Sequence, residues 1–247
     1  MNLVKNLFVI VGVLAAMGVT GVPVFAPPKI GVLSTGNELV DIKKTPAVGE
    51  VRDVNTHLLL ALAKAWGCPG KSCGIVPDEA KALTAALKTA CEENDIVLIS
   101  GGSSAGEADR TAEITASLGT VFCHGIAVKP GKPTVLGKVG DTAVFGLPGH
   151  PAACYFMASL LVKAHVDARM GRPGAVNTVT AALTEHVSSN HGREELLCVR
   201  LQNGRATPLY AKSGVISTLS AADGYVVIPR EAEGIRQGEK VIVNLFQ

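Results

Sequence analysis

The sequence has few aromatic residues, no paired cysteines and no run of basic residues, and each absence excludes a class of function. Phe, Trp and Tyr make up only 4% of the 247 residues, too few for platforms that stack nucleic-acid bases. The net charge of +2 is not concentrated by any run of Lys or Arg, so we predict neither a nucleic-acid nor a membrane surface. An anionic ligand must therefore be bound by a few residues of its own binding site and not by a broad basic surface.

The cysteines form no CxxC pair, and no histidine lies at metal-ligand spacing from them, so zinc-binding and redox motifs are disfavoured. Small apolar thiols are common in protein cores. We expect buried, reduced thiols in a cytoplasmic protein. The six are Cys68, Cys73, Cys91, Cys123, Cys154 and Cys198.

The N-terminal segment allows two interpretations. Lys5 precedes an apolar run over residues 7–19, which superficially looks like a signal peptide. However, glycines interrupt the run, it is too short to span a bilayer, and Leu7, Ile10 and Leu14 follow the spacing of a packed helix. We therefore predict that residues 1–27 form a helix and a lead-in to the first domain, in a chain that stays in the cytoplasm.

Apolar and amphipathic segments alternate between residues 28 and 172. The pattern predicts strands over residues 30–34, 73–76 and 95–100, a strand hairpin over residues 134–146, and helices over residues 55–66, 79–92, 111–118 and 151–170. Strands that alternate with helices form a mostly parallel sheet covered on both faces. We expect a three-layer α/β domain.

The character of the chain changes after the Gly-Arg-Pro-Gly stretch at residues 171–174, the one plausible interdomain hinge. Residues 175–247 show short alternating strands, for example over residues 195–201, 225–228 and 240–246. Asn203 and Gly204 predict a tight turn. A small all-β domain is therefore expected to follow the α/β domain.

Four unusual loops fall at the carboxyl ends of predicted strands, where open parallel sheets bind ligands. The loop over residues 100–109 combines three glycines with three serines, so its backbone N–H groups and hydroxyls can surround phosphate oxygens. A purely structural turn is the alternative for this loop. The other three loops cover residues 34–38, 77–79 and 147–151.

Charged residues are predicted near the same edge of the sheet. Glu38, Asp78 and Asp109 are carboxylates that can hold Mg²⁺, and Lys129 and Lys132 can neutralise phosphate or oxyanion charge. Each also has an ordinary structural alternative: a helix N-cap for Asp78, a solvated loop acid for Glu38 and a surface turn for the lysines.

His150 can act as an acid or base in principle, but the sequence supplies no carboxylate to orient it. We interpret His150 as a residue at the start of a helix.

Taken together, four segments resemble the molybdopterin molybdenumtransferase family, which includes the cofactor-synthesising part of gephyrin. They are STGNEL at residues 34–39, GGSSAGEAD at 101–109, VKPGKP at 128–133 and GLPGHP at 146–151. The similarity runs from about Val11 to the C-terminus and includes residues 192–195 and 213–217. Four linked motifs are more specific than any one glycine-rich loop.

The resemblance implies a molybdopterin-binding α/β domain followed by a small β-barrel. It also implies a reaction that joins molybdate to the dithiolene of adenylylated molybdopterin, releases AMP and depends on Mg²⁺. The expected partners are these two substrates and a second copy of the chain in a homodimer.

Residue by residue, the resemblance assigns catalytic and metal-binding roles to Glu38, Asp78 and Asp109. It assigns substrate binding to Thr35, Gly36, Gly101, Gly102, Ser103, Ser104, Gly106, Lys129, Lys132, Pro148, Pro151, Arg193 and Ser213.

The chain also departs from the family pattern. Asn37 replaces the usual aspartate before Glu38, His150 replaces an asparagine, Ala105 replaces a valine, and Asp223 stands where asparagine is usual. Members of the family carry two further N-terminal domains that help to complete the active site in the dimer. A separate chain that supplies these domains is therefore a further expected partner.

Two other functions remain open. The chain could be a non-catalytic module that binds molybdopterin, since Asn37 and the missing domains remove parts of the catalytic apparatus. It could also be a molybdopterin adenylyltransferase, which resembles the same α/β domain. The β domain argues against the adenylyltransferase, because that family lacks such an extension.

Overall fold

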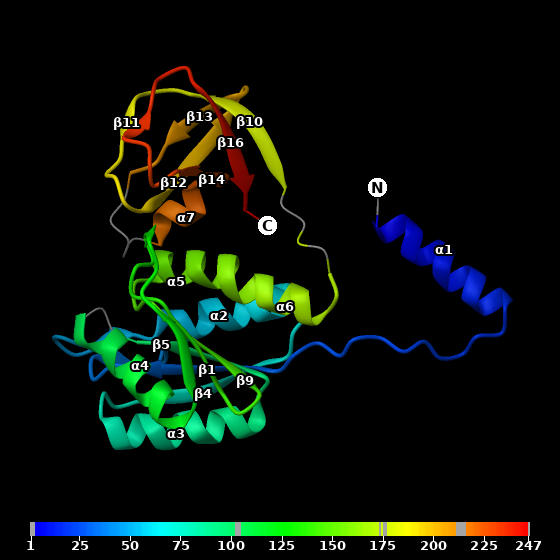
Figure 1. Ribbon diagram of the computed structural model, residues 1–247, viewed down its shortest axis with the longest axis vertical. Helices are drawn as coiled ribbons and strands as arrows, with labels where there is room; N and C mark the ends of the chain where they lie inside the picture. Colours follow the sequence, from blue (N-terminus) through cyan, green and yellow to red (C-terminus); the bar gives the residue numbers. More distant parts are fainter. Residues whose placement is uncertain (1–2, 102–104, 173, 175–176, 211–215, 247) are drawn as a thin grey trace.

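The computed structural model describes residues 3–101, 105–172, 174, 177–210 and 216–246. Two domains are stacked along the long axis of the molecule, and the N-terminal helix stands to one side of them (Figure 1). The α/β domain forms the lower half in this view and the β domain the upper half. The predicted order of an α/β domain followed by a β domain is therefore confirmed.

A six-stranded sheet forms the centre of the α/β domain. In spatial order its strands are β4 (Gly70–Val76), β1 (Ile30–Thr35), β5 (Ile96–Ser100), β9 (Thr142–Leu147), β8 (Val135–Val139) and β6 (Thr120–His124). The first four strands run parallel, and β8 and β6 are antiparallel to their neighbours. Every residue of β1 and β5 is buried, as expected when helices cover both faces of a parallel sheet.

Helices cover the two faces of this sheet (Figure 1). On the face toward the β domain lie α2 (Val54–Ala65) and a long helix made of α5 (Pro151–Met157), the π-helical turn η1 (Ala158–Val162) and α6 (Lys163–Arg169). On the opposite face lie α3 (Ala80–Glu93) and α4 (Ala105–Leu118). The three-layer prediction is confirmed. One detail was wrong: residues 105–109, expected in a loop, form the first turn of α4.

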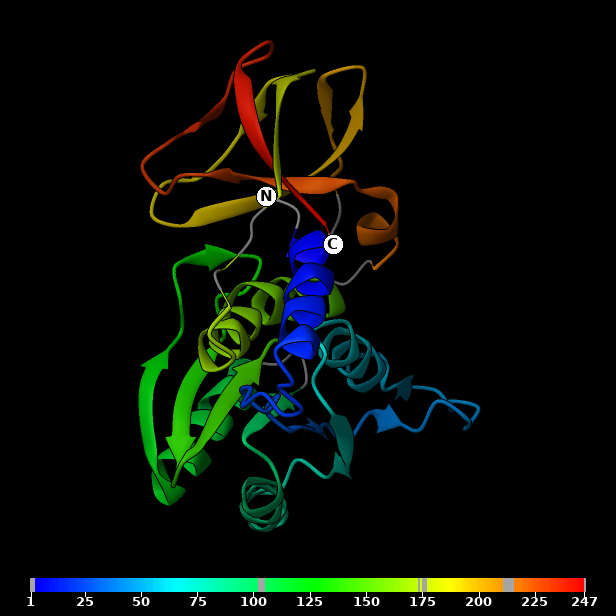
Figure 2. The ribbon, with the colours of Figure 1, turned by 90° about the vertical axis from the view of Figure 1, so that its right-hand side faces the viewer.

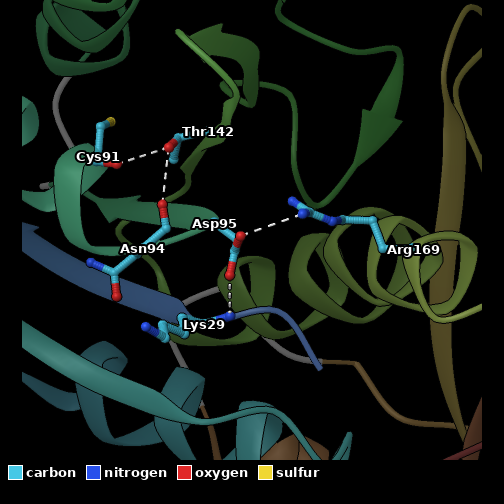
Figure 3. A network of polar contacts seen from close by, with 6 residues as sticks. All are labelled: Lys29, Cys91, Asn94, Asp95, Thr142 and Arg169. Carbon is cyan, nitrogen blue, oxygen red and sulfur yellow. Dashed lines mark hydrogen bonds and ion pairs between the residues drawn. The ribbon is translucent and has the colours of Figure 1, made fainter. Parts of the chain in front are cut away.

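A polar network ties together the strand ends farthest from the predicted ligand loops (Figure 3). Asp95, just before β5, accepts a hydrogen bond from the Lys29 backbone N–H at 2.8 Å and lies 3.4 Å from the Arg169 guanidinium. The Thr142 hydroxyl, at the start of β9, lies 2.9 Å from the carbonyl oxygens of both Cys91 and Asn94. These contacts align the starts of β1, β5 and β9.

The β domain is a closed barrel of five strands. They are β13 (Arg205–Pro208), β10 (Thr178–Leu183), β16 (Lys240–Leu245), β14 (Gly224–Ile228) and β12 (Glu194–Gln202). The barrel closes because β13 pairs with both β10 and β12. Asn203 and Gly204 have φ angles of 50° and 73°, as the tight turn between β12 and β13 requires, so this turn was predicted correctly.

Several smaller elements accompany the sheet and the barrel. They are the pair β2 (Leu39–Val40) and β3 (Val51–Arg52), the pair β11 (Val187–Ser188) and β15 (Gly234–Ile235), and the short helix α7 (Ser217–Ala221).

The two domains share one hydrophobic core. Phe156 of α5 is 2% exposed, and its ring contacts Tyr225 of the β domain at a centroid distance of 5.3 Å. Phe246 packs against both of these rings. A two-residue strand of the α/β domain, β7 (Val128–Lys129), also pairs with β12 of the barrel. The domain boundary seen in the sequence is therefore crossed by both packing and backbone hydrogen bonds.

The N-terminal segment is helical, as predicted, but the prediction that this helix packs on the domain was wrong. Helix α1 (Leu3–Ala16) exposes 59% of Leu7 and 52% of Ile10. None of the helices within the described part of the chain has both the length and the hydropathy to cross a bilayer.

Phe156 offers a direct test of the shared core. We expect Phe156→Ala to lower the free energy of unfolding by about 3–5 kcal/mol, because a large buried side chain leaves a cavity between the domains. Urea denaturation followed by circular dichroism measures this change. Phe122→Ala is the matched control, since Phe122 is 65% exposed and should cost much less. Equal losses for the two variants would contradict a core that depends on Phe156.

Candidate functional site

The carboxyl ends of three parallel strands meet at one edge of the α/β domain. Ser34 of β1 lies opposite Ser100 of β5, which in turn lies opposite Leu147 of β9. Thr35, Gly36 and Gly101 follow these positions directly, so the structure brings the predicted phosphate-binding loops to one edge. Gly102, Ser103, Ser104 and Ser213 lie outside the described residues, and Gly106 lies in the first turn of α4.

Helix α2 supplies a residue that joins two of these loops. Asp53 begins the helix by accepting a hydrogen bond from the Thr56 backbone N–H at 3.1 Å. Asn55 in the first turn then donates from Nδ2 to the Ser100 hydroxyl and to the Gly149 carbonyl oxygen, both at 2.8 Å. The ends of β5 and β9 are thereby linked through one amide.

Two buried oxygen atoms at this edge have no hydrogen-bond partner among the described residues: Oγ1 of Thr35 and Oδ1 of Asn55. Buried polar atoms are nearly always paired, because an unpaired one costs free energy. This edge can therefore accept further hydrogen bonds from a ligand or from the neighbouring loop.

Glu38 folds back over the loop that it follows. Gly36 has a φ angle of 152°, which favours glycine, and a Cβ there would lie 2.8 Å from Oε2 of Glu38, so the carboxylate would have to move. Glu38 is partly exposed and has no ion-pair partner among the described residues. It is thus a carboxylate available to a cation or a donor at the strand edge.

Asp78 does not cap a helix, which corrects the structural alternative for this residue. The N-cap position of α3 is Glu79. Asp78 instead forms an ion pair with Arg110, whose Nη1 also donates to the Asp78 carbonyl oxygen at 2.7 Å. The Asp78 backbone N–H donates to Oδ1 of Asn37 at 3.1 Å. Asn37 therefore links the β1 and β4 loops even without the charge of an aspartate.

The third predicted metal ligand, Asp109, lies at the surface. Its side chain is 62% exposed and lies 3.1 Å from Nε2 of His124 at the end of β6. Among the described residues, no group of three or more His, Cys, Asp or Glu side chains is placed to hold a metal ion. Glu38, Asp78 and Asp109 share an edge of the sheet but do not form a protein-only metal cage.

A basic cleft of about 740 Å³ lies between the two domains. Lys129, Lys132, Pro148 and Arg193, all predicted to bind substrate, line it. Lys129 Nζ forms a 3.0 Å ion pair with Glu195, whose other oxygen accepts from the Ser189 hydroxyl. Neither the Lys132 ammonium nor the Arg193 guanidinium pairs with another described residue. The cleft therefore contains two cations free to bind an anion.

Local sequence shapes the wall of this cleft. Gly131 has a φ angle of 135°, and a Cβ there would collide with Met157 of α5. Pro151 occupies the first turn of α5, where a proline costs no hydrogen bond. His150 precedes it at the N-cap position, but its side chain makes no capping hydrogen bond and lines the cleft instead. His150 marks the start of a helix, as predicted, and its ring is also available to a ligand.

The strand edge and the cleft are neighbours. Gly149, held by Asn55 at the strand edge, adjoins Pro148 and His150 in the cleft wall. Sequence reasoning missed Asn55, Glu195 and Tyr210, the last two of which line the cleft. Asp53, a typical helix N-cap residue two positions before Asn55, was the available signal that Asn55 lies in the first turn of a helix.

Cys68, Cys154 and Cys198 are buried, as predicted, whereas Cys73, Cys91 and Cys123 are partly exposed, so the prediction of buried thiols was wrong for these three. All six are free thiols, and burial raises the pKa of Cys154, next to Ser100, to about 12. Burial likewise raises the pKa of Cys198 in the cleft wall to about 11. Both thiols therefore stay protonated and unreactive near neutral pH.

Comparison with known proteins agrees with this architecture. Residues 31–168 match the family model described as a probable molybdopterin binding domain, and residues 180–246 match that of the MoeA C-terminal region, domain IV.

The solved structure of a molybdopterin biosynthesis MoeA protein from Pyrococcus horikoshii is 37% identical, with a TM-score of 0.84 over 96% of this chain and 59% of that one. A Methanocaldococcus jannaschii protein, named provisionally for molybdopterin biosynthesis, is 34% identical over 95% of this chain and 59% of its own length. The molybdopterin molybdenumtransferase of Bacillus subtilis is 29% identical over 96% of this chain and 57% of its own length. The chain thus spans about three fifths of these relatives. It belongs to the MoeA family of molybdenum cofactor biosynthesis proteins and carries the molybdopterin-binding domain and the C-terminal β domain of that family.

Proposed function

We propose that the chain binds adenylylated molybdopterin and molybdate, and that it transfers molybdate to the dithiolene with release of AMP. The observation that carries this proposal is the basic interdomain cleft directly beside the phosphate-binding edge of the sheet. The strand edge suits the phosphoanhydride that is cleaved, and the cleft suits the tetrahedral oxyanion that is transferred. The name of the Bacillus subtilis relative describes such a transferase.

The strand edge suits the phosphates of the substrate. Thr35 ends β1, and Gly36 and Gly101 directly follow β1 and β5. Glycines there leave room for phosphate oxygens to approach the backbone. The unpaired Thr35 hydroxyl would donate to a phosphate oxygen there, whereas Oδ1 of Asn55 can only accept a hydrogen bond from a donor group of the ligand. The Thr35 hydroxyl would also stabilise the negative charge that develops when the phosphoanhydride breaks.

The cleft suits molybdate. Lys132 and Arg193 are cations without partners among the described residues, and guanidinium groups bind oxyanions with two parallel hydrogen bonds. Lys129 is held by Glu195 at 3.0 Å, so it would add a positioned third cation. These side chains would orient the oxyanion beside the bound pterin.

The acidic residues fit Mg²⁺ only in a limited way. Proteins usually bind Mg²⁺ through one or two carboxylates, with substrate phosphates and waters completing the shell. Glu38 fits such a role because its carboxylate has no ion-pair partner among the described residues, whereas Asp78 and Asp109 are engaged by Arg110 and His124. When bound, the ion would neutralise the phosphates, and Glu38 would position it.

Two alternatives give way to this proposal for different reasons. The β domain supplies Arg193 and Glu195 to the cleft and so forms part of the proposed site. An adenylyltransferase, which lacks this domain, would have no need of these two residues. A non-catalytic module would need pterin binding but not the unpaired cations. A separate chain that supplies the domains present in longer relatives remains a proposed partner.

Arg193 tests the oxyanion site. We expect Arg193→Ala to weaken molybdate binding about tenfold or more, because a lost charge-assisted hydrogen bond costs about 1–3 kcal/mol. Isothermal titration calorimetry with molybdate measures the affinity. Arg205→Ala removes an exposed arginine at the start of β13 that does not line the cleft, and it should leave the affinity unchanged. A loss of the same size in both variants would count against the cleft.

Glu38 tests the enzyme assignment. We expect Glu38→Ala to slow AMP release from adenylylated molybdopterin, with molybdate and Mg²⁺ present, by a factor of about ten to a thousand, as when one electrostatic stabiliser is lost. Glu113→Ala, which removes an exposed carboxylate from α4, serves as the control. Both are assayed alone and with a chain that supplies the domains present in longer relatives. Tight binding of the adenylate without turnover in either case would leave only the binding module.

Asn37 tests the contribution of the missing carboxylate. Asn37→Asp keeps an oxygen that can accept the 3.1 Å hydrogen bond from the Asp78 N–H, and it adds a negative charge next to Glu38. We therefore expect a lower Mg²⁺ concentration to support half-maximal AMP release, with little change in the thermal unfolding midpoint. An unchanged Mg²⁺ requirement would show that residue 37 does not face the ion.

A further inference from the structure

Asn55 is a buried amide whose orientation is fixed by its hydrogen bonds. It lies in the first turn of α2 and is 6% exposed. Its Nδ2 donates both to the Ser100 hydroxyl and to the Gly149 carbonyl oxygen. A carbonyl oxygen can only accept, so the amide cannot turn end for end without losing the bond to Gly149. Oδ1 is therefore held on the other side, where it has no partner among the described residues.

The two acceptors of this amide lie on either side of the point where the sheet ends. The ladder between β5 and β9 stops with Ser100 opposite Leu147, and Gly149 follows two residues later, outside both strands. Strand pairing therefore does not itself fix the position of Gly149 relative to the phosphate-binding edge. The Asn55 amide supplies that link.

The first turn of α2 is a firm support for the amide. Asp53 caps the helix, and the Thr56 hydroxyl lies 2.9 Å from the Ser34 hydroxyl at the end of β1. All three of these side chains are buried. Asn55 therefore stands on a turn that is attached to the sheet, as a residue that holds another in place requires.

Gly149 belongs to the segment that forms one wall of the basic cleft. Its neighbours Pro148 and His150 line the cleft. The His150 carbonyl oxygen accepts from the Cys154 N–H at 2.9 Å, so this segment continues directly into the first turn of α5. Helix α2 lies alongside α5 between the sheet and the β domain (Figures 1 and 2). The bond from Asn55 to Gly149 thus ties the cleft wall to the strand edge.

We propose that Asn55 is a positioning residue for the transfer reaction. By holding Gly149, it sets the register between the phosphates at the strand edge and the molybdate in the cleft. The inference rests on the proposed function, since it concerns the alignment of the two substrates of that reaction. Two reacting groups that are displaced by about 1 Å react about a hundredfold more slowly, even where each still binds. Loss of the link should therefore slow the transfer and leave substrate binding largely intact.

Two substitutions of Asn55 test this role. In Asn55→Asp the carboxylate can still accept from the Ser100 hydroxyl, but it cannot donate to the Gly149 carbonyl oxygen. Asn55→Ala removes both bonds without burying a charge, so it serves where the aspartate variant does not fold. With adenylylated molybdopterin, molybdate and Mg²⁺, we expect kcat for AMP release to fall about ten- to a hundredfold and the KM of each substrate to change less than about threefold.

Asn94 provides the matched control. It is also a buried asparagine, 7% exposed, and its Nδ2 donates to the Ala90 carbonyl oxygen at 2.7 Å. It precedes β5 and so lies at the opposite end of the same strand from Ser100. Asn94→Asp and Asn94→Ala should lower the free energy of unfolding by a similar amount, because each loses a buried hydrogen bond, but they should leave kcat unchanged.

Amide hydrogen exchange gives a readout that does not depend on turnover. We expect the Cys154 amide to exchange faster in the Asn55 variants, because the segment that accepts its hydrogen bond is no longer held. The Asn94 variants should show wild-type exchange at this amide. Mass spectrometry of the peptide over residues 147–154 measures the rate.

Four results would overturn the inference. They are an unchanged kcat in both Asn55 variants, equal losses of kcat in the Asn55 and Asn94 variants, a raised KM with unchanged kcat, and wild-type exchange at Cys154 in both Asn55 variants. The third of these would mean that Asn55 binds a substrate and does not position the cleft wall. If the wild-type chain releases no AMP, the proposed reaction fails together with this inference. Release by the wild type combined with any of the four results contradicts the inference alone.

Discussion

The parallel alignment of β1, β5 and β9 is the constraint from which the site follows. These strands are fully buried or nearly so, and their backbone hydrogen bonds fix Ser34, Ser100 and Leu147 side by side. The network around Asp95 aligns the opposite ends of the same strands. Because parallel strands all end at one edge, loops more than a hundred residues apart in sequence meet there. Asn55 then joins two of these loops through its amide.

The second constraint is the attachment of the barrel to the α/β domain. Phe156 and its aromatic neighbours give the two domains a common core, and β7 extends the barrel sheet from within the α/β domain. The cations of the cleft depend on this attachment, since Lys132 comes from one domain and Arg193 from the other. The two domains therefore line one cleft, and loss of the barrel would remove the oxyanion binding that we propose as well as stability.

Much of this could be predicted from the sequence, for identifiable physical reasons. Buried strands are visible in the sequence as short apolar runs. Asn203 and Gly204 mark a turn that only a few residue types form. The parts that could not be predicted depend on contacts between distant residues. Asp78 looks like a helix cap until Arg110 is placed beside it. The spacing of Leu7, Ile10 and Leu14 predicts a packed helix, but the intervening residues are equally apolar and no described surface covers them. The strand β7 is only two residues long and gives no periodic signal.

We propose that the basic cleft binds molybdate and that the strand edge binds the phosphates of adenylylated molybdopterin in the same reaction. A crystal structure of the full chain with adenylylated molybdopterin and molybdate, in which molybdenum is located by anomalous scattering, tests it most directly. The account predicts molybdenum between Lys132 and Arg193, and the phosphates at the ends of β1 and β5 beside Thr35 and Gly101. Molybdenum or phosphates bound on another surface, with the cleft and strand edge free of ligand, would contradict it.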